Sequence, residues 1–222
     1  DELMEELRIF ESDAERRAEA VAFVCRSLPG WRTPMGVAAA QWIASLPTQN
    51  ASENVARTEA LSEATSSIHD ETVRRAITDT ALSLARECEL PDTILQLQDD
   101  ADLATWPDDS IDLRRWALAR SGKRAPELRR LERGVLDPDT PLRPSSIQRL
   151  KACFEGEAEF VEALSRLTGG ASPDRAAQLA RHCLQHFGAV LDDVVFLDML
   201  DALAGCSMTG PDDWATLSTR VA

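Results

Sequence analysis

The chain contains no tyrosine, and aromatic residues make up only 5% of its 222 residues. Aromatic and β-branched residues favour strands, whereas the alanine and leucine that dominate this sequence favour helices. No apolar run approaches the roughly 20 residues that cross a bilayer, so no membrane span is expected. The composition therefore predicts an all-α protein with no sheet and no membrane partner.

The cysteines form no disulfide pattern. There are five, an odd number without close pairs, and they lie on or beside apolar helical stretches: Cys25, Cys88, Cys153, Cys183 and Cys206. Reduced thiols of this kind are typical of proteins inside the cell, so we expect an intracellular, cytoplasmic protein. No signal peptide is visible, although a chain that starts at Asp1 is compatible with a fragment whose targeting segment is missing.

Motifs that carry chemistry are also missing. The sequence has no glycine-rich phosphate loop, no CxxC pair and no GxSxG nucleophile elbow. Serine, histidine and aspartate occur, but no pattern places them together. The sequence therefore predicts no catalytic residue and no cofactor.

Two histidines have the spacing of metal ligands. His182 and His186 are four residues apart, which puts two imidazoles on one face of a helix. The HExxH motif needs a glutamate directly after the first histidine, and Cys183 stands there instead. No third ligand is evident, so we predict no metal site. A helical metal-dependent enzyme with a site near His182 and His186 is one alternative function.

Helix-start signals, each a cap residue before an apolar stripe, recur along the chain. They fall at Thr33, Asp70, Asp109, Ser145, Ser172 and Thr209. The intervals are 37, 39, 36, 27 and 37 residues, and periods of about 34 to 47 residues are typical of stacked helical hairpins. Average helices and loops give a similar spacing in a bundle. The predicted fold is therefore all-α: stacked helical hairpins (α-solenoid-like), or else an irregular multi-helix bundle.

The hairpin pattern is clearest in residues 172–205. Ser172 and Pro173 suit the start of a helix, and a second, strongly apolar helix follows. Leu200 lies on this second helix, and we expect it to face the core. Pro173 recurs 38 residues later as Pro211, where the pattern begins again.

The last two hairpins resemble a known kind of repeat. With Ser172-Pro173-Asp174 before one amphipathic helix and Asp192-Asp193 before the next, they are similar to HEAT or octotricopeptide repeats. The octotricopeptide pattern has a Ser-Pro-acid or Ser-Pro-Gln start and a first helix rich in leucine and alanine. The resemblance covers residues 172–217; the upstream units at Asp70 and Asp109 lack the proline, and the 27-residue unit is too short. It implies a helical-hairpin architecture and no particular function.

The domain organisation is predicted from linker signals. Residues 137–145 contain three prolines and form the clearest linker in the sequence. We expect one all-helical domain over residues 1–222, with a sub-domain break near residues 137–145.

Positive charge is scarce except in one segment. The net charge of −14 disfavours nucleic acid or an anionic membrane as the main partner. Residues 110–151 nevertheless hold 11 basic and 5 acidic side chains, between flanking segments of net charge −13 and −7. Grouped positive charge creates a local potential that attracts an acidic partner.

This basic segment supplies most of the candidate partner-binding residues. Arginine outnumbers lysine nine to two there, which suits bidentate recognition of carboxylates or phosphates. The candidates are Trp106, Arg114, Arg115, Trp116, Arg120, Lys123, Arg124, Arg129, Arg130 and Arg133. Because two arginine doublets lie on successive helices, we expect them to converge on one surface. Alternatively, these arginines pair with the protein's own acidic side chains.

Together these observations favour a non-catalytic helical scaffold, adaptor or regulatory domain. Its expected partner is another protein, bound through an acidic surface of that partner. An RNA-binding helical-repeat protein that uses residues 110–151 is a further alternative, against which the net negative charge weighs.

Overall fold

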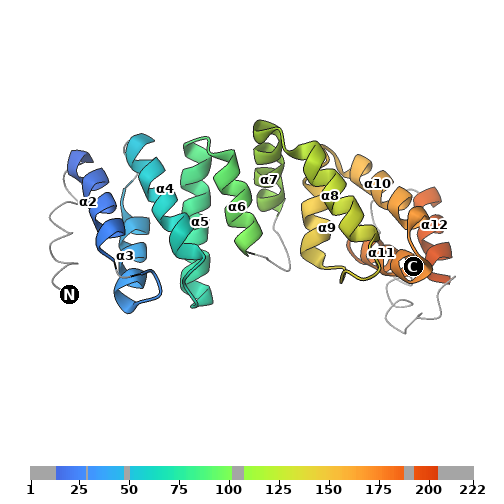
Figure 1. The fold of residues 1–222 in the computed structure, drawn as a ribbon. Helices are drawn as coiled ribbons and strands as arrows, with labels where there is room; N and C mark the ends of the chain where they lie inside the picture. Colours follow the sequence, from blue (N-terminus) through green and yellow to red (C-terminus); the bar gives the residue numbers. More distant parts are fainter. Residues whose placement is uncertain (1–13, 29, 48–50, 102–107, 188–192, 205–222) are drawn as a thin grey trace, which may run out of the picture. The chain divides into compact units, whose positions relative to one another are not determined.

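The computed structural model describes residues 14–28, 30–47, 51–101, 108–187 and 193–204. These residues form eleven α-helices and no strand, which confirms the all-α prediction (Figure 1). The helices are α2 (Ala14–Ser27), α3 (Pro34–Ser45), α4 (Ala51–Thr65), α5 (Glu71–Glu87), α6 (Pro91–Ala101), α7 (Asp108–Ser121), α8 (Arg124–Leu136), α9 (Pro144–Lys151), α10 (Glu157–Gly170), α11 (Pro173–Phe187) and α12 (Asp193–Ala204). None of these described helices has both the length and the apolar character that crossing a membrane requires.

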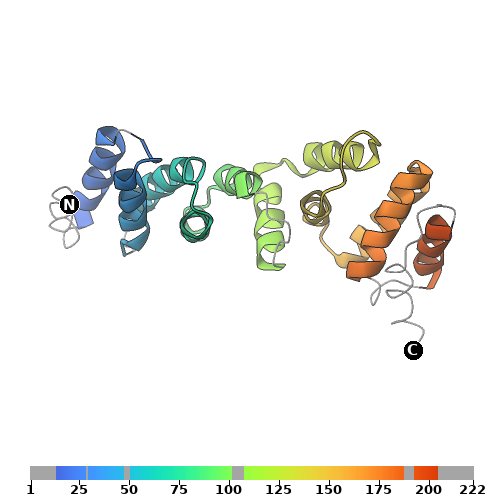
Figure 2. The ribbon, with the colours of Figure 1, turned by 90° about the horizontal axis from the view of Figure 1, so that it is seen from below.

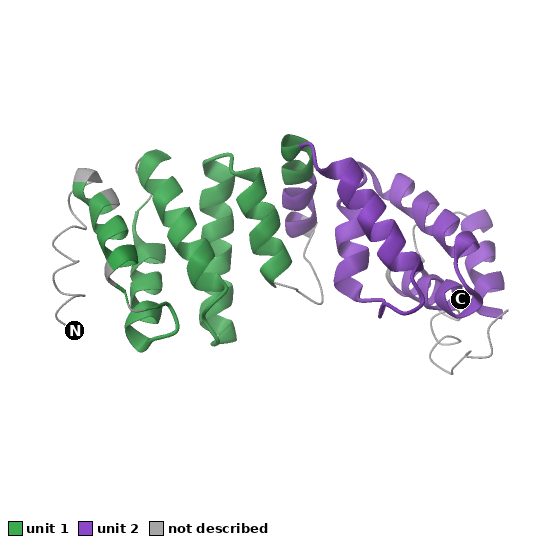
Figure 3. Ribbon diagram, in the orientation of Figure 1, with its two compact units in different colours: residues 1–103, 116–121 green, residues 104–115, 122–222 purple. Residues whose placement is uncertain are grey.

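The chain divides into two compact units (Figure 3). Unit 1 comprises Asp1–Leu103 and Trp116–Ser121, and unit 2 comprises Ala104–Arg115 and Gly122–Ala222. The division therefore runs through α7. The proline-rich segment 137–145, which the sequence marks as a linker, lies inside unit 2.

Polar side chains cap two helices at the positions that the sequence indicates. Oγ1 of Thr33 accepts a hydrogen bond from the backbone N–H of Gly36 at 3.0 Å, and Pro34 occupies the first turn of α3. The carboxylate of Asp70 accepts from the N–H of Val73 at 3.0 Å and caps α5. Each cap satisfies a backbone donor that has no partner within its helix, so it fixes where the helix begins.

The helices of unit 1 alternate between two layers. α4 contacts α2 and α6, and α3 contacts α5, so helices two apart in the chain lie in the same layer. α4 also packs against α3 and α5 across the layers, and Figure 1 shows α4, α5 and α6 side by side.

Small and branched apolar side chains form the core of unit 1. They are Ala20, Val21, Val24, Trp31, Ala39, Ala40, Trp42, Ile43, Leu46, Ala60, Leu61, Ala64, Ile68, Ile77, Ala81, Leu84 and Leu97. A Cβ at Gly36 would lie 2.4 Å from the carbonyl oxygen of Gly30. Glycine therefore allows the first turn of α3 to touch the backbone that precedes it.

Among its described residues, unit 1 also buries three charged side chains. Arg17 and Glu53 are 2% and 0% exposed and form an ion pair, with 3.3 Å between Nε and Oε1. Arg57 is 1% exposed and donates from Nε to the carbonyl oxygen of Ile43 at 3.2 Å and from Nη2 to that of Leu46 at 2.7 Å. Carbonyl groups at the end of a helix have no partner within it. Arg57 therefore ties α4 to the end of α3.

We expect Arg57→Leu to destabilise the protein by about 3–5 kcal/mol, because the buried carbonyl groups of Ile43 and Leu46 then lose their donor and the buried Glu53 loses a nearby positive charge. Arg57→Lys should restore little of this, since an ammonium has no planar fork to reach both carbonyls. Urea unfolding followed by circular dichroism measures both effects. Arg26→Leu, at an exposed position of α2, is the control. An unchanged midpoint in Arg57→Leu would show that this residue does not hold α3 and α4 together.

In unit 2, α10 links most of the helices. It contacts α8, α9, α11 and α12, while α11 packs beside α12 (Figure 2). The buried apolar side chains of these helices include Leu131, Val135, Ile147, Leu150, Phe160, Val161, Leu164, Leu167, Leu179, Ala180, Leu184, Met199 and Leu203. The core of unit 2 is thus built around both sides of α10.

The segment between α8 and α9 is bound to α11. Arg175, which is 3% exposed, donates from Nη2 to the carbonyl oxygens of Asp137, at 2.5 Å, and of Thr140. Its Nη1 donates to Oε1 of Gln178 at 3.1 Å. Within the segment, Oγ1 of Thr140 donates to Oδ2 of Asp137 at 2.6 Å. The proline-rich stretch is therefore a fixed part of unit 2.

The strongly apolar helix α12 buries only one side. Met199 and Leu203 are 0% and 4% exposed, whereas Val194 and Leu197 are 70% and 60% exposed. Leu200 is half-buried, so the expectation that it faces the core needs correction. Successive residues are turned by about 100° around a helix. Since Met199 points into the core, its neighbour Leu200 lies at the border of the buried face.

We expect Met199→Ala to cost about 2–5 kcal/mol of stability, because it opens a cavity at a fully buried position. Leu200→Ala should cost less, since part of its side chain is already in contact with solvent. Leu197→Ala is the control on the exposed side of the same helix. Chemical denaturation ranks the three variants, and a larger loss for Leu200→Ala than for Met199→Ala would contradict the orientation of α12.

Candidate functional site

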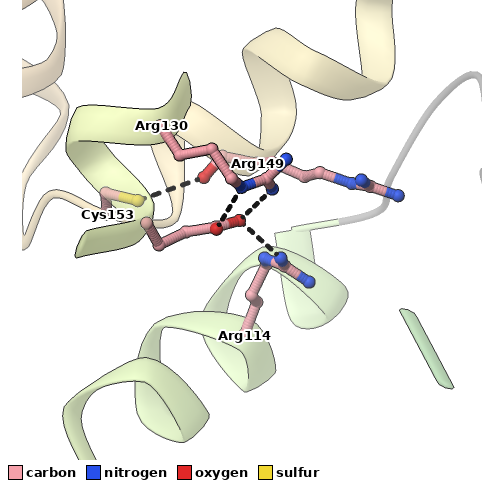
Figure 4. Close-up of polar contacts among 5 residues, drawn as sticks. Arg114, Arg130, Arg149 and Cys153 are labelled. Carbon is pink, nitrogen blue, oxygen red and sulfur yellow. Dashed lines mark hydrogen bonds and ion pairs between the residues drawn. The ribbon is translucent and has the colours of Figure 1, made fainter. Parts of the chain in front are cut away.

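The basic segment directs part of its charge into the interior of unit 2. Arg114 of α7 is 1% exposed, and its Nη2 lies 2.9 Å from Oε1 of Glu127 on α8. Arg130, one turn further along α8, donates to the same carboxylate from Nε at 2.9 Å and from Nη2 at 2.8 Å. Figure 4 shows both Arg114 and Arg130 directed at this carboxylate. Two arginines from different helices thus share one glutamate.

The surroundings of Glu127 favour its ionised form. Burial raises the pKa of Glu127, but the hydrogen bonds from Arg130 and Arg114 outweigh burial, and the pKa lies below its ordinary value. Nearby, Sγ of Cys153 donates to the carbonyl oxygen of Arg149 at 3.5 Å (Figure 4). Burial, followed by the charge of Glu127, raises the pKa of the Cys153 thiol to about 12. This thiol is therefore protonated at neutral pH and is a poor nucleophile.

Further arginines of the segment bind within unit 2. Nε of Arg115 donates to the carbonyl oxygen of Phe154 at 2.6 Å, and its Nη1 pairs with Asp112. Nη1 of Arg124 lies 2.8 Å from Oε1 of Glu155. Together with the pairs at Glu127, these contacts give four arginines of the segment acceptors within unit 2.

Trp116 and Arg120 belong to unit 1, and both contact side chains of that unit. The guanidinium carbon of Arg86 lies 3.7 Å from the centroid of the Trp116 ring, and that of Arg120 lies 6.0 Å from it. Nη2 of Arg120 is also 3.9 Å from Oε1 of Glu89. Trp116 is half-buried, so the two arginines make cation–π contacts with the ring at the surface of unit 1.

Two arginines of α8 present their charge outward. Arg129 and Arg133 are exposed, and neither makes an ion pair with any residue that the structure describes. Their spacing of four residues places both on one side of the helix. Lys123, directly before α8, is exposed as well. We refer to Arg129 and Arg133 as the α8 arginine pair.

His182 and Cys183, which are neighbours in the histidine pattern, lie in different environments. Cys183 is 0% exposed in the core, and burial raises the pKa of its thiol to about 12. His182 instead lines a pocket of about 210 Å³ on the other side of α11. The side chain of His186 lies outside the described residues. Among the residues that are described, no three His, Cys, Asp or Glu side chains group to hold a metal ion.

Several sequence features lie outside the described residues. They are Trp106, Asp192, Cys206 and the second copy of the 38-residue pattern, which begins at Thr209. The interface role of Trp106 and the internal repeat therefore stay predictions.

Two features of unit 2 are not evident from the sequence. The role of Glu127 is hinted at by its spacing of three residues from Arg130, which is typical of helical ion pairs. The contact with Arg114 depends on how α7 packs against α8. The pocket beside His182 likewise depends on the segment before α9 folding against α11, which no local pattern indicates.

No family model, curated protein or solved structure matches the chain. No activity therefore carries over to it from a known protein, and the resemblance of residues 172–217 to HEAT or octotricopeptide repeats stays a prediction.

We expect Glu127→Gln to destabilise the protein by about 3 kcal/mol at neutral pH, because the buried Arg114 then loses the negative charge of Glu127. Glu155→Gln removes an exposed carboxylate that also pairs with an arginine, and it should leave the unfolding midpoint nearly unchanged. Equal effects of the two substitutions would show that Arg114 does not depend on Glu127.

The same pair of variants has a pH signature. A carboxyl whose pKa is lower in the folded than in the unfolded state adds stability above its unfolded pKa. That stability disappears as the pH falls through the folded pKa. The wild type should therefore lose more stability than Glu127→Gln as the pH drops below the ordinary glutamate pKa, which thermal melts across this range measure.

Proposed function

We propose that this chain is a non-catalytic helical scaffold or adaptor that binds an acidic surface of another protein through the α8 arginine pair. The observation that carries the proposal is the contrast within the basic segment. Arg114, Arg115, Arg124 and Arg130 bind acceptors of unit 2, while the α8 arginine pair keeps its charge exposed.

The spacing of the pair suits a protein partner. Two guanidinium groups one turn apart on a rigid helix match carboxylates that are one turn apart on an acidic helix. The helix itself is held in place, since Glu127 anchors α8 to α7, and Glu132 of α8 pairs with Arg166 of α10 at 2.9 Å. Two fixed, exposed charges steer an acidic partner and set the on-rate more than the affinity.

The alternative function of RNA binding has less support in unit 2. An RNA binder gains affinity from each phosphate that a basic side chain neutralises. Four of the eleven basic side chains of the segment already bind acceptors of unit 2, which lowers the positive potential that a run of phosphates would meet. The test below therefore has to distinguish a short contact with RNA from binding of an acidic protein.

The test reverses the charge of the α8 arginine pair. Arg129→Glu with Arg133→Glu should leave the melting temperature nearly unchanged, because both side chains are exposed, and should weaken partner capture by about tenfold at low salt. Capture from a native extract, quantified by mass spectrometry with and without nuclease, is the measurement. Arg130 must be left intact, since it holds Glu127.

A matched control carries the same change in net charge in unit 1. Arg26 and Arg75 are exposed on α2 and α5 without an ion pair among the described residues. Arg26→Glu with Arg75→Glu should capture partners like the wild type. Equal capture by both double variants contradicts the proposal, and loss of capture after nuclease treatment favours RNA as the partner.

A further inference from the structure

We propose that the outward side of α12 is a docking surface for a second copy of this chain, and that α8 of that copy covers it. The inference rests on the proposed function, since it names the acidic surface that the α8 arginine pair binds. Both helices belong to unit 2. The contact therefore joins unit 2 of one copy to unit 2 of the next.

The outward side of α12 exposes apolar surface. Val194 and Leu197 are 70% and 60% exposed, and they lie one turn apart on the helix. Among the described residues, the other large apolar side chains that are exposed, Phe23 and Met35, lie on two different helices of unit 1. Covering apolar surface removes it from water, which is favourable in proportion to the area covered. This side of α12 therefore gains free energy from a partner.

Two carboxylates continue the same side of α12 toward its end. Asp198 and Asp201 are exposed, and neither forms an ion pair with any residue that the structure describes. Together with Val194 and Leu197 they occupy the i, i+3, i+4 and i+7 positions of one helix side. The surface is therefore apolar in its first turn and acidic in its second.

The exposed side of α8 has the complementary order. Pro126 is exposed near the start of the helix, and the α8 arginine pair follows at the i+3 and i+7 positions of the same side. When the two helices run parallel, the proline faces the apolar turn of α12 and the two arginines face its two carboxylates. The antiparallel direction would place the arginines against the apolar turn. This chain therefore itself carries a surface that fits its own α12 in one orientation.

Within one copy the two surfaces do not pair. Both helices pack against α10, and the α8 arginine pair and the two aspartates are exposed without an ion pair among the described residues. A copy that binds through its α8 therefore still offers its α12 to a further copy. Such a contact joins two different surfaces, so it either closes a ring or extends into a chain of copies.

The first test measures self-association of the full chain by sedimentation equilibrium. The net charge of −14 repels copies at a distance, and the matched surfaces are small. We therefore expect the average mass to rise with concentration, with a dissociation constant of about 100 µM. The mass of a single copy at every concentration up to about 1 mM overturns the proposal.

Charge reversal on either helix tests the match. Arg129→Glu with Arg133→Glu places like charges opposite each other, and so does Asp198→Arg with Asp201→Arg. Each double variant should associate at least about tenfold more weakly than the wild type. All four side chains are exposed, so the melting temperatures should stay nearly unchanged. Association of either variant as tight as that of the wild type contradicts the contact.

Mixing the two reversed variants restores the match. The acidic α8 of one variant then meets the basic α12 of the other, and the mixture should associate with about the affinity of the wild type. Both variants keep a net negative charge, so general attraction between them does not explain such a result. A mixture that associates no more than the separate variants overturns the pairing of α8 with α12, even where the wild type associates through another surface.

A matched control separates the local match from net charge. Arg26→Glu with Arg75→Glu has the same net charge as the reversed α8 variant, but the changes lie on α2 and α5. It should associate within about twofold of the wild type, because distant exposed charges are screened by salt. A loss as large as that of the α8 variant shows that net charge, and not the match, controls association.

Failure of this inference is distinguishable from failure of the proposed function. If the wild type stays a single copy while Arg129→Glu with Arg133→Glu captures less of a different acidic protein from the extract, the second copy is excluded and the docking role of α8 stands. If that variant alters neither self-association nor capture, both proposals are overturned.

Discussion

A buried guanidinium group needs acceptors around it, and both units of this protein depend on meeting that requirement. In unit 1, Arg57 places its fork on the carbonyl groups that end α3, while Arg17 pairs with the buried Glu53. In unit 2, Arg114 reaches across to Glu127 on the next helix. Each of these contacts joins helices that are separate in the sequence. Because removing one partner of a buried ion pair costs more than the pair itself contributes, these contacts specify which helices are neighbours.

The same requirement decides which charges of the basic segment remain available. Glu127 takes two arginines, and the carbonyl oxygen of Phe154 takes Arg115. A count of charges along residues 110–151 therefore overstates the positive potential at the surface of unit 2. The α8 arginine pair is exposed and forms no ion pair with the described residues. Its position on a helix that is anchored to α7 and to α10 is more informative than the number of arginines.

The sequence predicts much of the fold because helix starts and apolar spacing are local properties. The caps at Thr33 and Asp70 are examples, since each side chain bonds a backbone N–H three residues further on. Contacts between helices join residues far apart in the sequence, so the sequence predicts these contacts less well than it predicts the helices. The sequence marks residues 137–145 as a linker because of their prolines, yet Arg175, some 35 residues away, binds this segment to α11. Likewise Leu200 and Met199 are equally apolar neighbours, and only packing against the other helices decides which is buried.

The pocket beside α11 follows from the same non-local contact. Arg175 holds the segment before α9, which brings Leu142 and Pro144 opposite the polar face of α11. The same guanidinium also donates to Oε1 of Gln178 on the exposed face of α11. One buried arginine thus holds the segment before α9 and a side chain of α11 at once. Because its acceptors are two backbone carbonyls and one carboxamide, a substitution of Arg175 would release the segment from α11 and lower the stability of unit 2 together.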